Sequence, residues 1–498
     1  MPTPLLKGGR DPRELRWFVY LAFLFPACAG FLFGFDIGAM SACIKSLLGG
    51  DSPDLRSATM HSTSLIGATL GSVLVFRVGE PLGRRRELMV GAALYFVGSL
   101  VSVATPPAAA FASVIVGRII YGFGIAFSMH SAPVYISEMS PADVRGLLVS
   151  LKEAFIVGGI TIGFGISAIA QNLEFLHEED IFRVVWALPL ILSPIIFFGM
   201  QAMPPSPRWL LLRYQRAKPS LEPSDWQHPL RAAALASLVR FRRGLPLEVV
   251  EAELNEICAS LDSEVAEEGS YAELFRSPRA LIAGLGLISL QQLTGQPSVL
   301  NYQEPIFEDA GFASFASTAA VIVGAAKLAA TLCTVSIVDR FGRRPLLFIG
   351  IGMMLVALTL LTVGFQLASP DVGSGDSKAV HLAQGWPPVI IFALVLYVCG
   401  YQIGFGPITW LIISEVFPLR TRTRALSMAV VVNFGFNLGV TFALDPMEQW
   451  IDTLSPGRGP SYLFMIYAMF SVLSMLFVYK CVPETKGKSL EQIEAMLR

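Results

Sequence analysis

The chain has 498 residues, of which 53% are hydrophobic and only 15% are charged. An ordinary soluble domain is about 25% charged, so this composition excludes a soluble enzyme and a disordered chain. The net charge of −1 gives no overall attraction to nucleic acid, and the six cysteines have no paired spacing that would indicate a disulfide framework or a zinc site. A polytopic membrane protein remains.

Twelve apolar runs are long enough to cross a bilayer as helices, which takes about 20 residues each. Only helices and closed barrels satisfy backbone polar groups in lipid, and these runs are too long for barrel strands. We therefore expect an all-α membrane protein. The runs lie at about 17–44, 59–76, 88–105, 110–136, 153–172, 184–203, 280–303, 316–338, 345–367, 387–414, 425–444 and 461–481.

Basic residues are distributed unequally between the two sides of these helices. Of the 37 Lys and Arg residues, 30 fall on one side and five on the other. Because basic loops stay in the cytosol, we expect a multi-pass integral membrane protein with cytosolic termini at 1–16 and 483–498. The polar segment 204–279 lies on the same side, and its heptad-like apolar spacing predicts amphipathic linker helices.

Two short motifs occur once in each half of the chain, at the same helix junction. They are Ile136-Ser137-Glu138 with Ile413-Ser414-Glu415, which are 277 residues apart, and Gly83-Arg84-Arg85 with Gly342-Arg343-Arg344, which are 259 apart. This parallel repeat predicts two pseudo-symmetric six-helix bundles, at 17–203 and 280–482. In such an architecture the substrate site lies at the midplane between the halves.

Seven motifs, in this order, resemble those of the sugar porter family of the major facilitator superfamily. They are Arg118–Gly122, Pro133–Glu138 with Arg145–Gly146, Ser206–Trp209, Gln291–Gly295, Asp339–Arg344, Gly406–Trp410 and Pro483–Gly487. The resemblance covers nearly the whole chain, and Gln291–Val299 is most similar to the plant and algal vacuolar-glucose or D-xylose-proton-symporter-like group. It implies the major facilitator fold and a transporter, not an enzyme.

The resemblance implies proton-coupled symport of a monosaccharide, a hexose such as glucose or a pentose, by alternating access. The alternatives are a facilitative uniporter with the same site and a transporter-like sugar sensor. We expect no cofactor other than protons as the coupling ion, no metal and no nucleic-acid partner. The protein is expected to be monomeric, in the vacuolar or the plasma membrane.

Ionisable residues inside expected helices are functional candidates by default. Asp36 and Arg118 match the proton-coupling pair of symporters in this family. Burial disfavours an ionised carboxylate and a neighbouring arginine favours it, so such a pair can bind and release a proton. The alternative is a permanent structural pair. His130 is expected to be a hydrogen-bonded packing residue, with a proton role as its alternative.

A sugar site needs amides for the hydroxyl groups and an aromatic face for the ring. The resemblance implies that five residues contact the sugar, and Gln402 stands where some facilitative members carry Glu. Pro297 replaces a common Asn, so one hydrogen bond to the sugar is lost or relocated. The five matching residues are Gln291, Gln292, Trp410, Asn433 and Asn437.

Two further positions of the sugar site carry charges in this chain. Glu153 stands where most sugar porters have Gln, and Lys327 where they commonly have Asn. Either ion alone would be costly inside the membrane. We therefore expect the two to pair across the central cavity, directly or through sugar or water. The alternative is a static bridge beside the pocket.

Charged residues gather at the cytosolic helix ends, where ion pairs can latch the halves in one state. Plain positive-inside anchoring is the alternative. Glu80-Pro81 stands where the family has Asp-Arg, and Pro205 where it usually has Glu, so we expect a weaker latch in the first half. The gate candidates are Arg84, Arg85, Glu138, Arg145, Asp339, Arg343, Arg344, Glu415, Arg422 and Glu484.

Overall fold

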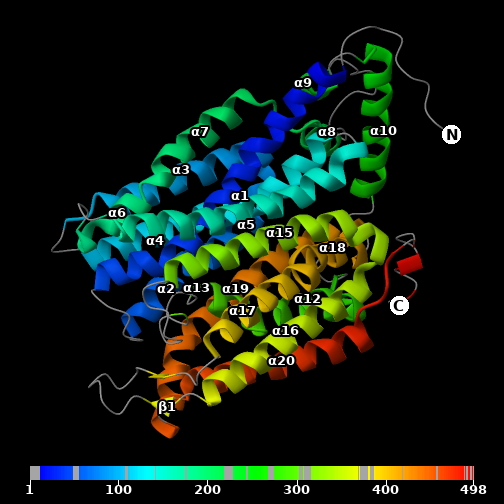
Figure 1. The fold of residues 1–498 in the computed structure, drawn as a ribbon. Helices are drawn as coiled ribbons and strands as arrows, with labels where there is room; N and C mark the ends of the chain where they lie inside the picture. The colour runs from blue at the N-terminus through cyan, green and yellow to red at the C-terminus, as the bar shows by residue number, and fades with distance from the viewer. Residues whose placement is uncertain are drawn as a thin grey trace.

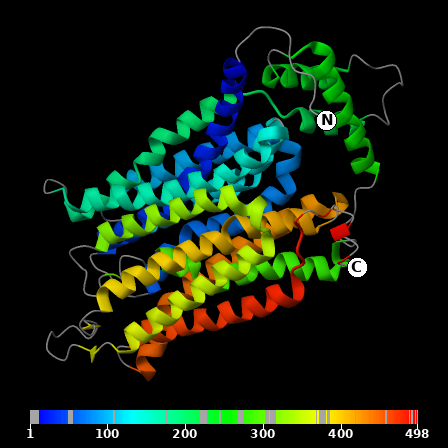
Figure 2. The same ribbon diagram turned by 45° about the vertical axis from the view of Figure 1, so that its right-hand side comes forward.

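The structure is a computed structural model of the chain. It describes residues 12–48, 55–106, 110–140, 142–173, 177–217, 228–242, 245–266, 274–301, 307, 316–367, 369–370, 380–381, 386–417, 419–455, 458–486, 488, 492–493 and 496. Two groups of long helices lie side by side, one built from each half of the chain (Figure 1). The view in Figure 2 shows the same two groups.

The first half forms long helices that follow one another in antiparallel fashion. They are α1 (Pro12–Leu48), α2 (Leu55–Leu82), α3 (Arg84–Val103), α4 (Ala110–Met139), α5 (Ala142–Gln171), and the pair α6 (Ile181–Val185) and α7 (Leu188–Ala202), with a short 3₁₀ turn at Glu178–Asp180. Their apolar side chains bury a core between α1, α3 and α4 that includes Leu32, Tyr95 and Tyr121.

The second half repeats this arrangement with two interrupted helices. Its helices are α12 (Pro278–Leu293), α13 (Gln296–Asn301), α15 (Ala316–Phe341), α16 (Arg343–Gln366), α17 (Trp386–Gly404), α18 (Gly406–Val416), α19 (Leu419–Leu454) and α20 (Gly459–Cys481). Between α16 and α17, the two-residue strands β1 (Ser369–Pro370) and β2 (Val380–His381) pair antiparallel, a small exception to the all-α expectation.

Eleven helices of the described residues are long and apolar enough to span a membrane, against twelve expected runs. The difference lies at 280–303, which was expected as one helix and is two, α12 and α13. The chain turns at Gly295, whose φ of +93° suits only glycine. A side chain there would also clash with the ring of Tyr467.

The halves meet along two helix pairs, α5 with α15 and α2 with α19. In the first pair, a side-chain carbon at Gly324 would lie 3.1 Å from Thr161, so the backbones come close. Beside the second pair, the ring of Phe33 in α1 meets that of Phe434 in α19 edge to face, with the ring centres 5.9 Å apart. These contacts bring residues of both halves close together along the interface.

The described residues of the expected linker include the helices α8 (Pro207–Ala217), α9 (Pro229–Phe241) and α10 (Leu247–Ala266), of which α8 and α10 are amphipathic as expected. They pack on one another through buried leucines and valines, including Val250, Leu254 and Leu261. The linker helices lie at the end of the bundle where α20 ends (Figure 1), which we call the linker face. Arg242 fastens them to it by donating to the Met139 carbonyl at 3.2 Å.

Gly295→Ala is expected to destabilise the protein by about 1–3 kcal/mol, the usual cost of a strained backbone conformation. The physical reason is the positive φ together with the clash against Tyr467. Gly352→Ala is the matched control, because its new carbon would lie 3.7 Å from Met475 in ordinary contact. Thermal unfolding of the purified proteins measures both. Equal unfolding midpoints would show that the break does not require glycine.

Candidate transport site

The two helix breaks of the second half lie against each other and satisfy each other's backbone. The hydroxyl of Tyr397 in α17 donates to the carbonyl of Thr294 at 3.0 Å. In return, Gln291 of α12 donates through Nε2 to the carbonyl of Phe405 at 3.2 Å. The carbonyl of Phe405 also accepts from the backbone N–H of Thr409 at 3.2 Å, so Gln291 adds a second donor there. These bonds hold Gln291 of α12 against the break between α17 and α18.

The second glutamine faces α19 and forms an amide cluster. Gln292 Nε2 donates to Asn433 Oδ1 at 2.7 Å, and Asn437 Nδ2 donates to Gln292 Oε1 at 3.3 Å. Asn433 and Asn437 are partly exposed. The structure thus brings together three of the predicted sugar contacts, and it directs the adjacent glutamines to different helices, Gln291 to the break between α17 and α18 and Gln292 to α19.

Buried polar atoms without partners surround the second break. Both side-chain atoms of Gln402 and the hydroxyl of Thr409 are buried and have no hydrogen-bond partner within the described part of the chain. Trp410, the next residue of α18, is partly exposed. Buried polar groups are almost always paired in folded proteins, so these atoms are suited to a polyhydroxylated ligand.

Glu153 and Lys327 lie near each other without direct contact. Their charges act on each other across the interface of α5 and α15, but no ion pair within 4 Å joins them in this structure. The Lys327 ammonium lies 5.2 Å from the ring centre of Tyr401. The Tyr401 hydroxyl in turn interacts with Gln291 and with the charge of Glu153. Direct pairing is absent here, and pairing through sugar or water stays a prediction.

Asp36 and Arg118 form the predicted ion pair inside the first bundle. Both side chains are almost fully buried. The guanidinium lies between two aromatic rings, 5.0 Å from the centre of Tyr121 and 4.9 Å from that of Trp186. Arginine over aromatic faces is stabilised electrostatically, more so when it is desolvated. The rings hold Arg118 in place beside the carboxylate.

A small cavity connects this ion pair to the second half. It is lined from the first half by Asp36 and His61 among others, and from the second half by Gln296, Pro297 and Asn437. Asn437 also belongs to the amide cluster. One member of the ionisable pair, Asp36, and one candidate sugar contact, Asn437, therefore line the same cavity, and Pro297 lines it instead of offering an amide.

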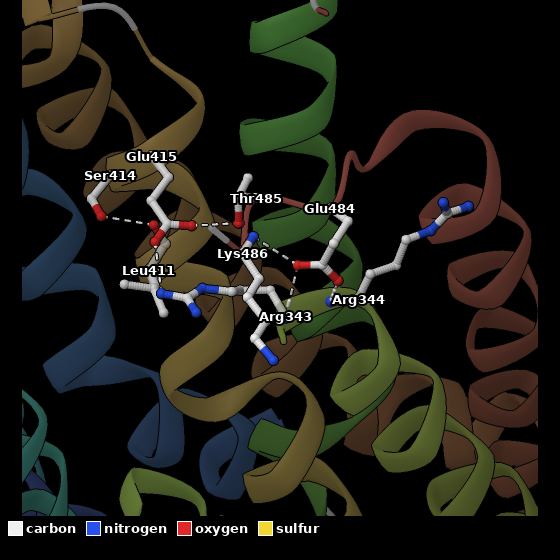
Figure 3. A network of polar contacts seen from close by, with 8 residues as sticks. All are labelled: Arg343, Arg344, Leu411, Ser414, Glu415, Glu484, Thr485 and Lys486. Atoms are coloured by element: carbon white, nitrogen blue, oxygen red, sulfur yellow. Dashed lines mark hydrogen bonds and ion pairs between the residues drawn. The ribbon is translucent and has the colours of Figure 1, made fainter. Parts of the chain in front are cut away.

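The second-half gate residues form a network at the linker face (Figure 3). Arg343 Nη2 donates to Glu415 Oε1 at 2.9 Å, and Thr485 donates to the other carboxylate oxygen at 2.5 Å. The carboxylate of Glu484 accepts from the backbone N–H groups of Arg343 and Arg344, at 3.2 and 3.0 Å. Glu484 thus caps the N-terminus of α16, where helix N–H groups lack partners.

The electrostatics of Glu484 follow from this position. Burial by itself raises the pKa of a carboxyl, but backbone N–H groups of Lys486, Arg344 and Arg343 outweigh it and hold the pKa of Glu484 below its ordinary value of 4.5. The network therefore favours the ionised form of Glu484.

The first-half gate is built differently, and the expected weaker latch stays a prediction. Arg84 Nε lies 3.6 Å from Glu138 Oε1, whereas Arg343 Nη2 lies 2.9 Å from Glu415 Oε1. In place of a carboxylate, the ring of Trp209 from the linker covers Gly83, and its Nε1 donates to the Glu80 carbonyl at 2.8 Å. An aromatic ring thus covers this glycine in the first half, where the second half has the carboxylate of Glu484.

Both described gate pairs join helices of the same half, Arg84 with Glu138 and Arg343 with Glu415. They do not bridge the halves in this structure, so a latch between the halves stays a prediction. Arg85 lies in the first turn of α3, and Arg344 packs on the rings of Phe348 and Tyr479. The side chains of Arg145, Asp339 and Arg422 lie outside the described residues.

Several residues that sequence reasoning missed belong to these sites. Tyr401 and Trp186 stand in apolar runs, where an aromatic residue suggests packing or lipid contact. Glu87 follows three arginines and looks like part of a charged helix end, yet it is fully buried against His130. His61 lines the cavity of Asp36. Of these residues, only Glu87 and His61 could have been noticed in the sequence, because their side chains are ionisable.

Comparison with known proteins identifies the class. A family model described as "Sugar (and other) transporter" matches residues 22–497. The chain therefore belongs to this family of membrane transporters and has the major facilitator fold, with twelve spans in two pseudo-symmetric six-helix bundles.

Individual relatives cover nearly the full length. The chain is 40% identical to D-xylose-proton symporter-like 2 of Arabidopsis thaliana, over 99% of this chain and 93% of that protein. It is 30% identical to the glucose transporter GlcP of Staphylococcus epidermidis, over 96% and 97%. The structure is similar to that of the proton:xylose symporter XylE bound to 6-bromo-6-deoxy-D-glucose, with a TM-score of 0.76 and 25% identity, over 97% of this chain and 99% of that chain.

Glu484→Gln is expected to lower stability by about 0.3–1 kcal/mol above pH 4.5, because it removes an anion from a helix N-terminus. Since the pKa of Glu484 is lowered in the folded state, its contribution is present above the ordinary carboxyl value and is lost as the pH falls below it. The difference between wild type and variant should therefore shrink in acid. Thermal midpoints across the acid range measure this.

Glu80→Gln serves as the control for this prediction, because Glu80 is an exposed carboxylate that pairs with Arg216 and caps no helix. A difference between wild type and Glu484→Gln that stays constant with pH would contradict the assigned role.

Proposed function

We propose that the protein is a proton-coupled monosaccharide symporter that works by alternating access. The observation that carries the proposal is the small cavity lined by both Asp36, the carboxylate of the buried ion pair, and Asn437, a member of the amide cluster. A proton-binding group and a hydroxyl-binding group that share a cavity can influence each other's occupancy. The printed names of the relatives, which include proton symporters and a glucose transporter, support this reading.

The residues divide the work of transport among them. A proton on Asp36 neutralises the carboxylate and frees Arg118, which changes the charge on the cavity wall next to Asn437. Sugar hydroxyls bind the amides of Gln292, Asn433 and Asn437, and the partnerless atoms of Gln402. These contacts all belong to the second half, and Asn437 also lines the cavity that Asp36 of the first half lines. Bound sugar would therefore lie where the halves meet, as in other transporters built from two repeats.

The orientation follows from the charge distribution. The linker face carries the basic excess, so we place it, with both termini, in the cytosol. The coupling proton then enters from the opposite face together with the sugar. Vacuolar and plasma membranes both fit this arrangement.

The direct test is uptake of labelled hexoses, pentoses and polyols into proteoliposomes, with and without a pH gradient. We expect at least one monosaccharide to accumulate above its external concentration only when the gradient is present. Equilibration that ignores the gradient would make the protein a uniporter. Binding of sugar without any flux would make it a sensor.

Asp36→Asn is expected to abolish proton-driven accumulation and to spare equilibrative exchange, because the amide keeps the shape of the carboxylate but takes up no proton. Uptake against a gradient and counterflow of labelled sugar measure the two activities separately. Glu80→Gln removes an exposed carboxylate and should accumulate sugar normally. If Asp36→Asn still concentrates sugar, Asp36 is not the coupling carboxylate.

Glu153→Gln and Lys327→Asn are each expected to harm transport, because each leaves an uncompensated charge at the interface of α5 and α15. The double variant should recover part of the loss, since no unpaired charge remains. Initial uptake rates and membrane yields of all four proteins form a double-mutant cycle. A double variant no better than the worse single one would show that the two charges do not depend on each other.

Trp410→Ala is expected to weaken sugar binding by about 1–3 kcal/mol, the value of a large apolar side chain. Folding should be largely retained, because the ring is only partly buried. Apparent sugar affinity and the thermal midpoint separate the two effects. Unchanged affinity combined with a poor yield of folded protein would assign Trp410 to packing.

A further inference from the structure

A second buried acid lies in the first half, outside the proposed coupling pair. Glu87 of α3 and His130 of α4 meet with Oε1 and Nδ1 2.6 Å apart. The Glu87 side chain is completely buried, whereas 21% of the His130 side chain is exposed. The partly exposed His130 ring thus lies between the buried Glu87 carboxylate and the protein surface.

The other oxygen of this carboxylate has no partner. Glu87 Oε2 is buried and accepts no hydrogen bond within the described part of the chain. It faces α2, since a side-chain carbon at Gly79 would lie 3.2 Å from Oε2 and 3.3 Å from the His130 ring. A buried carboxylate with one partner is costly unless that partner carries a positive charge or the acid is protonated.

The charged groups around the pair have other partners or lie nearer the linker face. Arg84, one turn before Glu87, reaches Glu138, and Glu80 of α2 pairs with Arg216 of α8. The helix α7, which packs on α3, has no titratable side chain. Further charged side chains on the surrounding elements include Asp36 and Lys45 of α1, Arg56 and Arg77 of α2, Arg85 and Arg86 of α3, Arg118 of α4, Lys152 and Glu153 of α5, and Arg208 and Arg213 of α8. Arg118 pairs with Asp36, and Arg213 lies over Trp209.

We propose that Glu87 and His130 form a second proton-binding site, which holds one proton as a carboxylate–imidazolium pair and tightens the contact between α3 and α4. The same two helices carry the first-half gate: Arg84 lies one turn from Glu87, and Glu138 about two turns from His130. With its proton bound, the pair carries no net charge and holds α3 and α4 together. Arg84 of α3 and Glu138 of α4 therefore stay within reach of each other.

Loss of the proton has a defined consequence. The pair releases H⁺ to water and becomes a neutral imidazole beside a carboxylate, which leaves one uncompensated charge in a buried site. The contact between α3 and α4 then loosens, and the gate at the linker face loosens with it. Only the effect on transport rests on the proposed function; the proton site itself does not.

Thermal unfolding of the purified full-length protein between about pH 6 and pH 9 tests the site without a transport assay. The wild-type midpoint should fall by about 2–5 °C as the pH rises. Glu87→Gln has no carboxylate that could be left buried without a cation, so this fall with pH should be absent from the variant. His130→Gln leaves the carboxylate without its cation, so its midpoint should be low at neutral pH and should recover in acid as Glu87 takes a proton.

The double variant Glu87→Gln/His130→Gln should restore stability and show no pH dependence from this site. His177→Gln, which removes an exposed histidine whose side chain makes no cap hydrogen bond, is the matched control and should keep the wild-type pH dependence. A purely packing role predicts shifted midpoints with unchanged pH dependence. Parallel curves for wild type and Glu87→Gln, or no acid recovery of His130→Gln, would overturn the proposal.

Sugar exchange at equal pH on both sides supplies the transport readout. Wild-type exchange should slow as the pH rises, and this alkaline decline should be absent from Glu87→Gln. If the protein exchanges no sugar, the thermal curves still decide on the proton site. If exchange declines equally in both proteins while their thermal curves differ, the site binds a proton but does not act on the gate, and that part of the proposal fails.

Discussion

The structure depends on one constraint: inside a membrane, every backbone polar group must find its partner within the protein. Continuous helices meet it by themselves, but an interrupted helix exposes free carbonyl groups. The second half contains two such interruptions and sets them against each other. Tyr397 donates to the carbonyl of Thr294 at the first break. Gln291 adds a second donor to the carbonyl of Phe405 at the other, which also accepts from the backbone N–H of Thr409. The candidate sugar site lies where the two breaks meet.

The two halves solve the same structural problem with different chemistry. In the second half, the anionic Glu484 caps α16 and the Arg343–Glu415 pair is short. In the first half, the aromatic ring of Trp209 covers the corresponding glycine and the ion pair is longer. The first bundle holds the buried ionisable pairs instead, Asp36 with Arg118 and Glu87 with His130. Proton chemistry and amide chemistry are thus separated between the halves, and a cavity lined by both joins them.

Much of this architecture could be predicted from the sequence, because hydropathy and charge act over long runs of residues. The helix positions, the repeat and the Asp36–Arg118 pair follow from such signals. The break at Gly295 was missed because the run at 280–303 is long and apolar enough on average to predict one helix. Gly295 and Pro297 are residue types that can interrupt a helix, but the close contact with Tyr467 that fixes the break exists only in the folded structure. Glu87 was hidden for a similar reason: its burial depends on how α2 and α4 close over it, which its neighbouring arginines do not reveal.

The central claim is that the buried carboxylate and the sugar contacts act on each other through their common cavity. It is tested most directly by recording proton and sugar movement together in wild-type proteoliposomes that start without a pH gradient. Sugar added outside should drive proton entry, seen with an internal pH dye, in a fixed ratio to the labelled sugar taken up. Sugar entry at full rate without any proton movement would contradict the account.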